Sequence, residues 1–213
     1  LRWEALLEGR DARVVRSDRA LPLSAEGAVL LGTEDFSGRP TVFSGGAIIQ
    51  RGFRISELPE AAYFEPDLIP LESVRFSNGA TVLGFLREDP SSLPLAGHTW
   101  TVFMIWRVDE LWSEDYTVFA HIVDEIGVKH SQVDMPALPF GQQRIGERVM
   151  NRMEFIVGES VPEKGPLFLH FGMYNDTHSS EILDTFGESV GTSGVIQIRA
   201  GGQPLARWDE IAL

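Results

Sequence analysis

Residues 115–137 read DYTVFAHIVDEIGVKHSQVDMPA, and this stretch decides the fold. Side chains from Asp115 to Asp124 alternate between two faces, and a period of two is typical of a β-strand. One face carries Tyr116, Val118, Ala120 and Ile122, and the other carries Thr117, Phe119, His121 and Val123. Residues 125–127 end in glycine, which tolerates a positive φ and predicts a tight turn. Residues 128–135 then predict a returning strand, so the stretch predicts a β-hairpin.

Strands of similar length are expected on both sides of this hairpin. They cover residues 74–77, 80–87, 99–107, 149–157, 167–174 and 195–199. Asn78-Gly79, between the first two, is a strong signal for a two-residue hairpin turn. No convincing helix interrupts these strands, so residues 71–213 predict a mainly β domain, an antiparallel, jelly-roll-like sandwich. The strands at 99–107 and 167–174 are apolar on both faces, and we expect the N-terminal segment or a partner to cover the second face.

Residues 1–70 predict shorter elements than the rest of the chain. Leu1 to Glu8 predict one short amphipathic helix that stops at Gly9. Short strands are expected at 12–15, 28–31, 41–43 and 47–50, separated by turn-rich pieces. Residues 57–70 are rich in proline and acids and predict a linker or a strap across the surface. We therefore expect a small mixed α/β segment and a proline-rich linker before the sandwich.

Composition narrows the classes of function. The chain has 213 residues and a net charge of −13, and a field of that sign repels nucleic acid and anionic membranes. Cysteine is absent, which excludes disulfides, thiol catalysis and thiolate metal sites. No apolar run approaches the ~20 residues that a membrane-spanning helix needs. The chain starts at Leu1 without methionine, so we expect a soluble piece of a longer or processed protein.

Several of these strands together resemble one known family. The segments are VRFSNGATVLGFL, TWTVFMIWRV, the hairpin stretch itself and FLHFGMYNDTHSSEIL, within residues 74–184. They resemble a bacterial β-sandwich that is appended, on the outer face of the membrane, to glycosyltransferases similar to the dolichyl-phosphate-mannose protein mannosyltransferase family. The matching residues are Trp106, Asp115 to Asp124, Gly127, Gln132, Asp134, Pro136, Gly172, Tyr174 and Glu181. The chain departs from that pattern at Pro136-Ala137, Gln143 to Glu147 and Asn175-Asp176.

The resemblance implies an accessory module and not a catalytic one. It implies a place outside the cytoplasm, tethered to the membrane-embedded portion of a parent chain that carries the catalytic acid. Contact with carbohydrate or with an acceptor would then be the role of this domain. The alternative is a structural or protein-interaction sandwich that binds no ligand and docks through its apolar second faces.

Trp112 is the first candidate for ligand contact. It is expected in a loop beside acids, and an exposed indole next to acids is suited to stacking on a sugar ring. Glu114, Asp115 and Tyr116 complete the expected ligand-binding set. The alternative for Trp112 is a packing role at the edge of the sandwich.

Signals for catalysis and metal binding are weaker. Gly187 to Gly191 match the G-x-S-x-G pattern, but a strand is expected after Ser189 where a nucleophile elbow needs a helix, so we interpret this stretch as a turn. A carboxylate pair for glycoside hydrolysis would have to come from Asp109, Glu110, Glu114, Asp115, Asp124, Asp134 or Glu147. The five histidines do not have zinc-site spacing. No cofactor is expected, although loop carboxylates and carbonyls are suited to a structural calcium ion.

Overall fold

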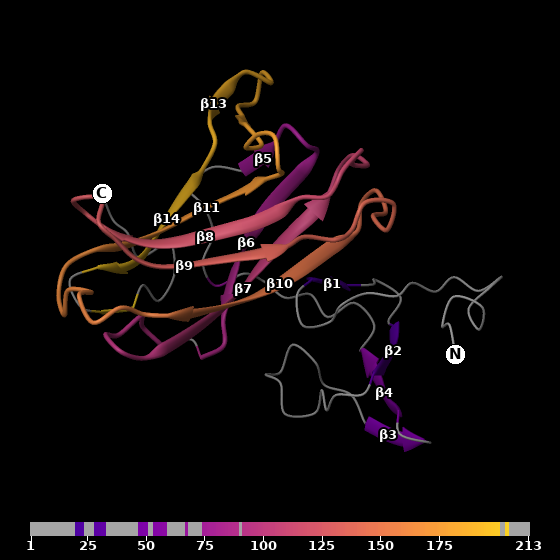
Figure 1. Ribbon diagram of the computed structural model, residues 1–213, viewed down its shortest axis with the longest axis horizontal. Coiled ribbons are helices and arrows are strands. Elements are labelled where there is room, and N and C mark those ends of the chain that lie inside the picture. The colour runs from indigo at the N-terminus through magenta and orange to yellow at the C-terminus, as the bar shows by residue number, and fades with distance from the viewer. Residues whose placement is uncertain are drawn as a thin grey trace.

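The computed structural model describes residues 20–23, 28–32, 47–50, 53–58, 67, 74–89, 91–200 and 203–204. In this part of the chain the regular structure is all β-strand, without a helix. The strands form antiparallel sheets, and the two larger ones overlie one another as a sandwich (Figure 1). The predicted fold class, a mainly β antiparallel sandwich, is confirmed.

The sandwich has a seven-stranded sheet and a five-stranded sheet. The larger one runs, in spatial order, through β1 (Ala20–Leu23), β10 (Arg148–Ile156), β7 (Thr99–Val108), β6 (Ala80–Arg87), β5 (Val74–Phe76), β12 (Ile182–Leu183) and β13 (Ser189–Gly191). The smaller one runs through β15 (Gln203–Pro204), β14 (Gly194–Ala200), β11 (Leu167–Tyr174), β8 (Thr117–Asp124) and β9 (Lys129–Pro136). The chain crosses between the sheets after β7, β9, β10, β11 and β13.

The predicted hairpin is β8 and β9, paired antiparallel from Thr117↔Pro136 to Val123↔Lys129. Its turn uses a positive φ of 85° at Gly127. The Asp124 carboxylate closes the turn, because its Oδ1 accepts hydrogen bonds from the amides of Ile126 and Val128. Asp124, which the alternation predicted only as a strand residue, thus also stabilises the turn at which the strand ends.

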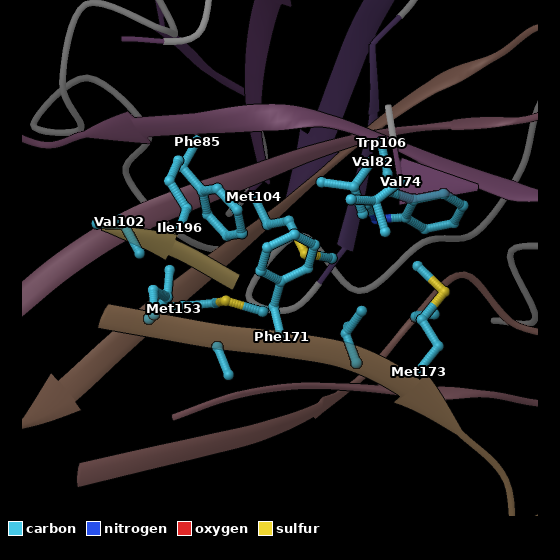
Figure 2. Close-up of a cluster of buried hydrophobic side chains, with 14 of the residues drawn as sticks. Val74, Val82, Phe85, Val102, Met104, Trp106, Met153, Phe171, Met173 and Ile196 are labelled. Carbon is cyan, nitrogen blue, oxygen red and sulfur yellow. The ribbon is translucent and has the colours of Figure 1, made fainter. Parts of the chain in front are cut away.

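The core lies between the two sheets. Val82, Phe85, Met104 and Trp106 project from the larger sheet toward Phe171, Met173 and Ile196 of the smaller one (Figure 2). The rings of Phe85 and Phe171 meet edge to face with centroids 5.0 Å apart. One polar pair is buried with them: the Trp106 indole donates a 2.8 Å hydrogen bond to Oδ1 of Asn151. A buried donor that kept no acceptor would be costly, so this pair ties β7 to β10 inside an apolar core.

The strand expected at 47–50 matches β3 (Ala47–Gln50), and the one at 28–31 matches β2 (Ala28–Gly32). Both flank β4 (Phe53–Leu58) in a three-stranded sheet, and β4 runs past the expected start of the linker at residue 57. β1 pairs with β10 at one edge of the seven-stranded sheet. Asp67 forms a 2.8 Å ion pair with Arg87. The helix expected over residues 1–8 and the strands expected at 12–15 and 41–43 lie outside the described residues.

Candidate functional site

Trp112 does not offer an exposed indole, and that expectation is wrong. Its side chain is only 4% exposed and lies in the core cluster. The indole stacks on Trp106 with ring centroids 5.2 Å apart and an interplanar angle of 14°. Its edge also meets Tyr116 at 5.2 Å. The Trp112 side chain therefore turns inward from the loop between β7 and β8, and the alternative of a packing role at the edge of the sandwich fits this residue.

The neighbours of Trp112 divide between the core and the surface. Tyr116 is buried, and burial together with the nearby Glu114 charge raises the pKa of its phenol. Asp115 is exposed, and its Oδ1 accepts a 2.5 Å hydrogen bond from the amide of Phe140. The structure thus brings the four expected residues together at one end of the sandwich but turns both aromatic rings inward. Neither Trp112 nor Tyr116 therefore presents its ring to solvent.

A different surface combines aromatic and polar side chains on regular strands. This surface is the face of the five-stranded sheet that points away from the core, and we call it the outer face. Cross-strand partners on β8 and β11 set its rows: Thr117 with Tyr174, Phe119 with Gly172, His121 with His170 and Val123 with Phe168. On one side, β9 extends these rows with Pro136 next to Thr117, Asp134 next to Phe119 and Gln132 next to His121. Gln197 and Val195 of β14 extend the rows of Phe168 and His170 on the other side.

The aromatic side chains of the outer face are only partly covered. Phe119, His121, Phe168, His170 and Tyr174 are all of intermediate exposure. The second face of β11 is therefore not sealed as expected. On β7, by contrast, Phe103 and Ile105 of the second face are each 1% exposed and therefore covered. The second face of the larger sheet is thus buried at Phe103 and Ile105, whereas the aromatic side chains on the second face of the smaller sheet reach solvent.

Phe119 is the centre of the outer face. A Cβ placed on its partner Gly172 would lie 2.5 Å from the Phe119 ring and 2.7 Å from the carbonyl oxygen of Thr192. The absence of a side chain at Gly172 therefore lets the ring lie against the backbone of β11. The His121 ring lies 5.0 Å away and the Tyr174 ring 6.1 Å away. The three rings form a continuous aromatic strip.

Polar groups line the β9 side of this strip. The Tyr174 hydroxyl donates a 3.3 Å hydrogen bond to Asp134, and Gln132 donates another of 3.3 Å to the second oxygen of that carboxylate. Lys129 donates in turn to the Gln132 carbonyl. Burial raises the pKa of the Tyr174 phenol, and the Asp134 charge adds to this effect. The aromatic strip thus has donors and acceptors along one edge.

Some candidate catalytic residues have other roles in the structure. Ser189 lies in β13 and the chain continues into β14, so no nucleophile elbow forms. Several candidate acids have structural partners: Asp109 binds Thr81 and Arg107, Glu110 pairs with Arg75, and Asp124 pairs with His130 at 2.9 Å. Among the described residues, no three or more His, Asp or Glu side chains form a group that could hold a metal ion.

The alternation of β8 and β11 already separated the residues of the outer face from those of the core. It did not indicate that Gly172 stands opposite Phe119, because pairing register joins residues that are distant in sequence. The resemblance flagged both positions, Phe119 within Asp115 to Asp124 and Gly172 by itself. A glycine inside an apolar strand was the available signal of close approach at that point.

The two larger sheets define a mainly β sandwich. Comparisons with known proteins add little to this description. No family model and no curated protein matches the chain. Among solved structures it is similar to the C-terminal domain of wzt, with a TM-score of 0.41, 12% identity, and coverage of 70% of this chain and 91% of that one. It is also similar to a Niemann-Pick type C2 protein from the Japanese carpenter ant, with a TM-score of 0.32, 14% identity, and coverage of 61% and 96%. In the part of the chain that the structure describes, no helix has the length and apolar character to cross a membrane.

Proposed function

We propose that this chain is a non-catalytic β-sandwich domain that contacts neutral glycans through its outer face. The observation that carries the proposal is the ring of Phe119, which lies against Gly172 between Tyr174 and His121, with the polar edge of Asp134 and Gln132 beside it.

The chemistry of a sugar ring fits this arrangement. One face of a pyranose carries C–H groups and packs on an aromatic ring, while its hydroxyls need polar partners. The Phe119 ring supplies the first surface, and Gln132, Asp134 and Tyr174 supply the second. The net charge of −13 favours neutral sugars, because it repels uronic acids and phosphorylated glycans.

We further propose that the domain acts as an accessory module outside the cytoplasm, tethered to a membrane glycosyltransferase-like parent chain. The support is the resemblance of the hairpin stretch and of its neighbouring strands to such modules. The glycan would then be part of the substrate or of the acceptor of that parent.

The proposal is tested by screening neutral oligosaccharides for binding and repeating the positive titrations with Phe119→Ala. A stacking contact contributes about 0.5–1.5 kcal/mol, so we expect affinity to fall roughly twofold to tenfold. Phe140→Ala is the matched control, because Phe140 is 57% exposed in a loop and lies off the outer face. Equal affinity for wild type and Phe119→Ala would place the glycan elsewhere on the protein.

A second candidate function is docking on a protein partner. The hairpin of β12 and β13 extends from the edge of the larger sheet (Figure 1), with Phe186 88% exposed and Val190 65% exposed. A folded protein that responds to none of the glycans would favour this function. Loss of partner capture in Phe186→Ser, with retained capture in Phe119→Ala, would identify the hairpin as the docking element.

A further inference from the structure

Two histidines of the outer face stand side by side on neighbouring strands. His121 of β8 and His170 of β11 are direct partners in the antiparallel register. Directly opposed residues in such a pair have Cβ atoms about 4.5–5.5 Å apart and point to the same side of the sheet. The two imidazoles are therefore presented together to the solvent.

The pair has apolar rows on two sides and Gln132 of β9 beside His121. Val123 and Phe168 form the next row on one side, and Phe119 and Gly172 form the row on the other. The Phe119 ring lies 5.0 Å from that of His121. Val195 stands opposite His170 on β14. Both histidines are half-buried among these neighbours, so their rings have few orientations to lose on binding a ligand.

The surroundings of both imidazoles favour the neutral state, which is the one that binds metal ions. Burial lowers the pKa of His121, Lys129 and His170 lower it further, and Asp134 opposes them. Burial also lowers the pKa of His170. The lowered pKa values favour the neutral form of each ring, in which one ring nitrogen carries a free lone pair.

We propose that His121 and His170 together chelate a divalent transition-metal ion such as Cu²⁺, Ni²⁺ or Zn²⁺. Imidazole nitrogen suits these ions, whereas Ca²⁺ and Mg²⁺ prefer oxygen ligands. Water completes the coordination, so the site is open and differs from a closed structural zinc site with four protein ligands. The inference does not depend on glycan binding, because it rests only on the pairing of the two histidines.

The test is a titration of the protein with Cu²⁺, followed by isothermal calorimetry and by the electron paramagnetic resonance spectrum of the bound ion. We expect one bound ion whose spectrum shows two imidazole nitrogens. His121→Gln and His170→Gln should each weaken binding at least tenfold. Affinity should also fall as the pH drops through the imidazole pKa values, because the ligands must be deprotonated.

His98→Ala is the matched control, because His98 is exposed and lies outside the outer face. It should leave the affinity unchanged. Melting temperatures measured without metal identify any variant that loses binding because it loses its fold. The spectrum of the wild-type complex identifies the metal ligands without any substitution. Unchanged affinity in both glutamine variants, or a spectrum with fewer than two imidazole nitrogens, would overturn the proposal.

Discussion

The ring of Phe119 occupies the space that a side chain would fill at Gly172. A Cβ on Gly172 would lie 2.5 Å from two atoms of that ring. The two residues are direct partners on β8 and β11. One small residue in the middle of a central strand therefore determines how a large ring on the next strand lies on the sheet.

Gly172→Ala tests this relationship. The added methyl group meets both the Phe119 ring and the Thr192 carbonyl, so we expect a loss of about 1–3 kcal/mol in the free energy of unfolding, as for other overpacked sites. Glycan affinity should fall as well, because the ring must leave its place. Urea denaturation and glycan titration measure the two effects.

The control is the same substitution in a Phe119→Ala background. It should cost less there, since the contact with the ring has been removed and only the contact with Thr192 remains. Equal costs in both backgrounds would show that Phe119 and Gly172 are not coupled.

Trp112 should behave as a core residue. Trp112→Ala removes an indole that is 4% exposed, and we expect a loss of about 3–5 kcal/mol in unfolding free energy. Trp112→Phe should keep the fold and leave glycan affinity unchanged. A selective loss of affinity in a stable Trp112→Phe protein would return the binding site to the loop between β7 and β8.

The hydrogen bond between Trp106 and Asn151 should couple the contributions of these two residues to the free energy of unfolding. Asn151→Leu leaves the buried indole donor of Trp106 without this acceptor, at a cost of about 1–3 kcal/mol by urea denaturation. Asn151→Leu combined with Trp106→Phe should lose less than the two single costs added together. Strict additivity would contradict an energetic link between these residues.

Asp124 should contribute to acid sensitivity. Partial burial favours its neutral form, but hydrogen bonds from His130 and from the amides of Val128 and Ile126 outweigh this and lower its pKa. Because the folded pKa lies below the unfolded one, the contribution to stability is complete above about pH 4 and is lost as pH falls through the lowered value. Asp124→Asn should therefore lose stability at pH 7 and decline less on acidification than wild type. Parallel declines in thermal melts from pH 7 to pH 3 would exclude this role.

Local sequence patterns were enough to find most of the sandwich. β6 and β11 begin and end where alternation predicted, because period two in a half-buried strand is a local property. β12 and β13 were missed, since strands of two or three residues carry too little pattern to recognise. β1, β4 and β15 were also not predicted.

The candidate site was likewise predicted only in part from the sequence. The sequence by itself determined that Phe119 and His121 share one face of a strand, and that Phe168, His170 and Tyr174 share one face of another. Only the tertiary structure decided that these faces adjoin, that Gly172 lies beneath Phe119, and that Trp112 turns inward. Side-chain alternation follows from the geometry of a single strand, whereas register and burial depend on contacts between segments far apart in the chain.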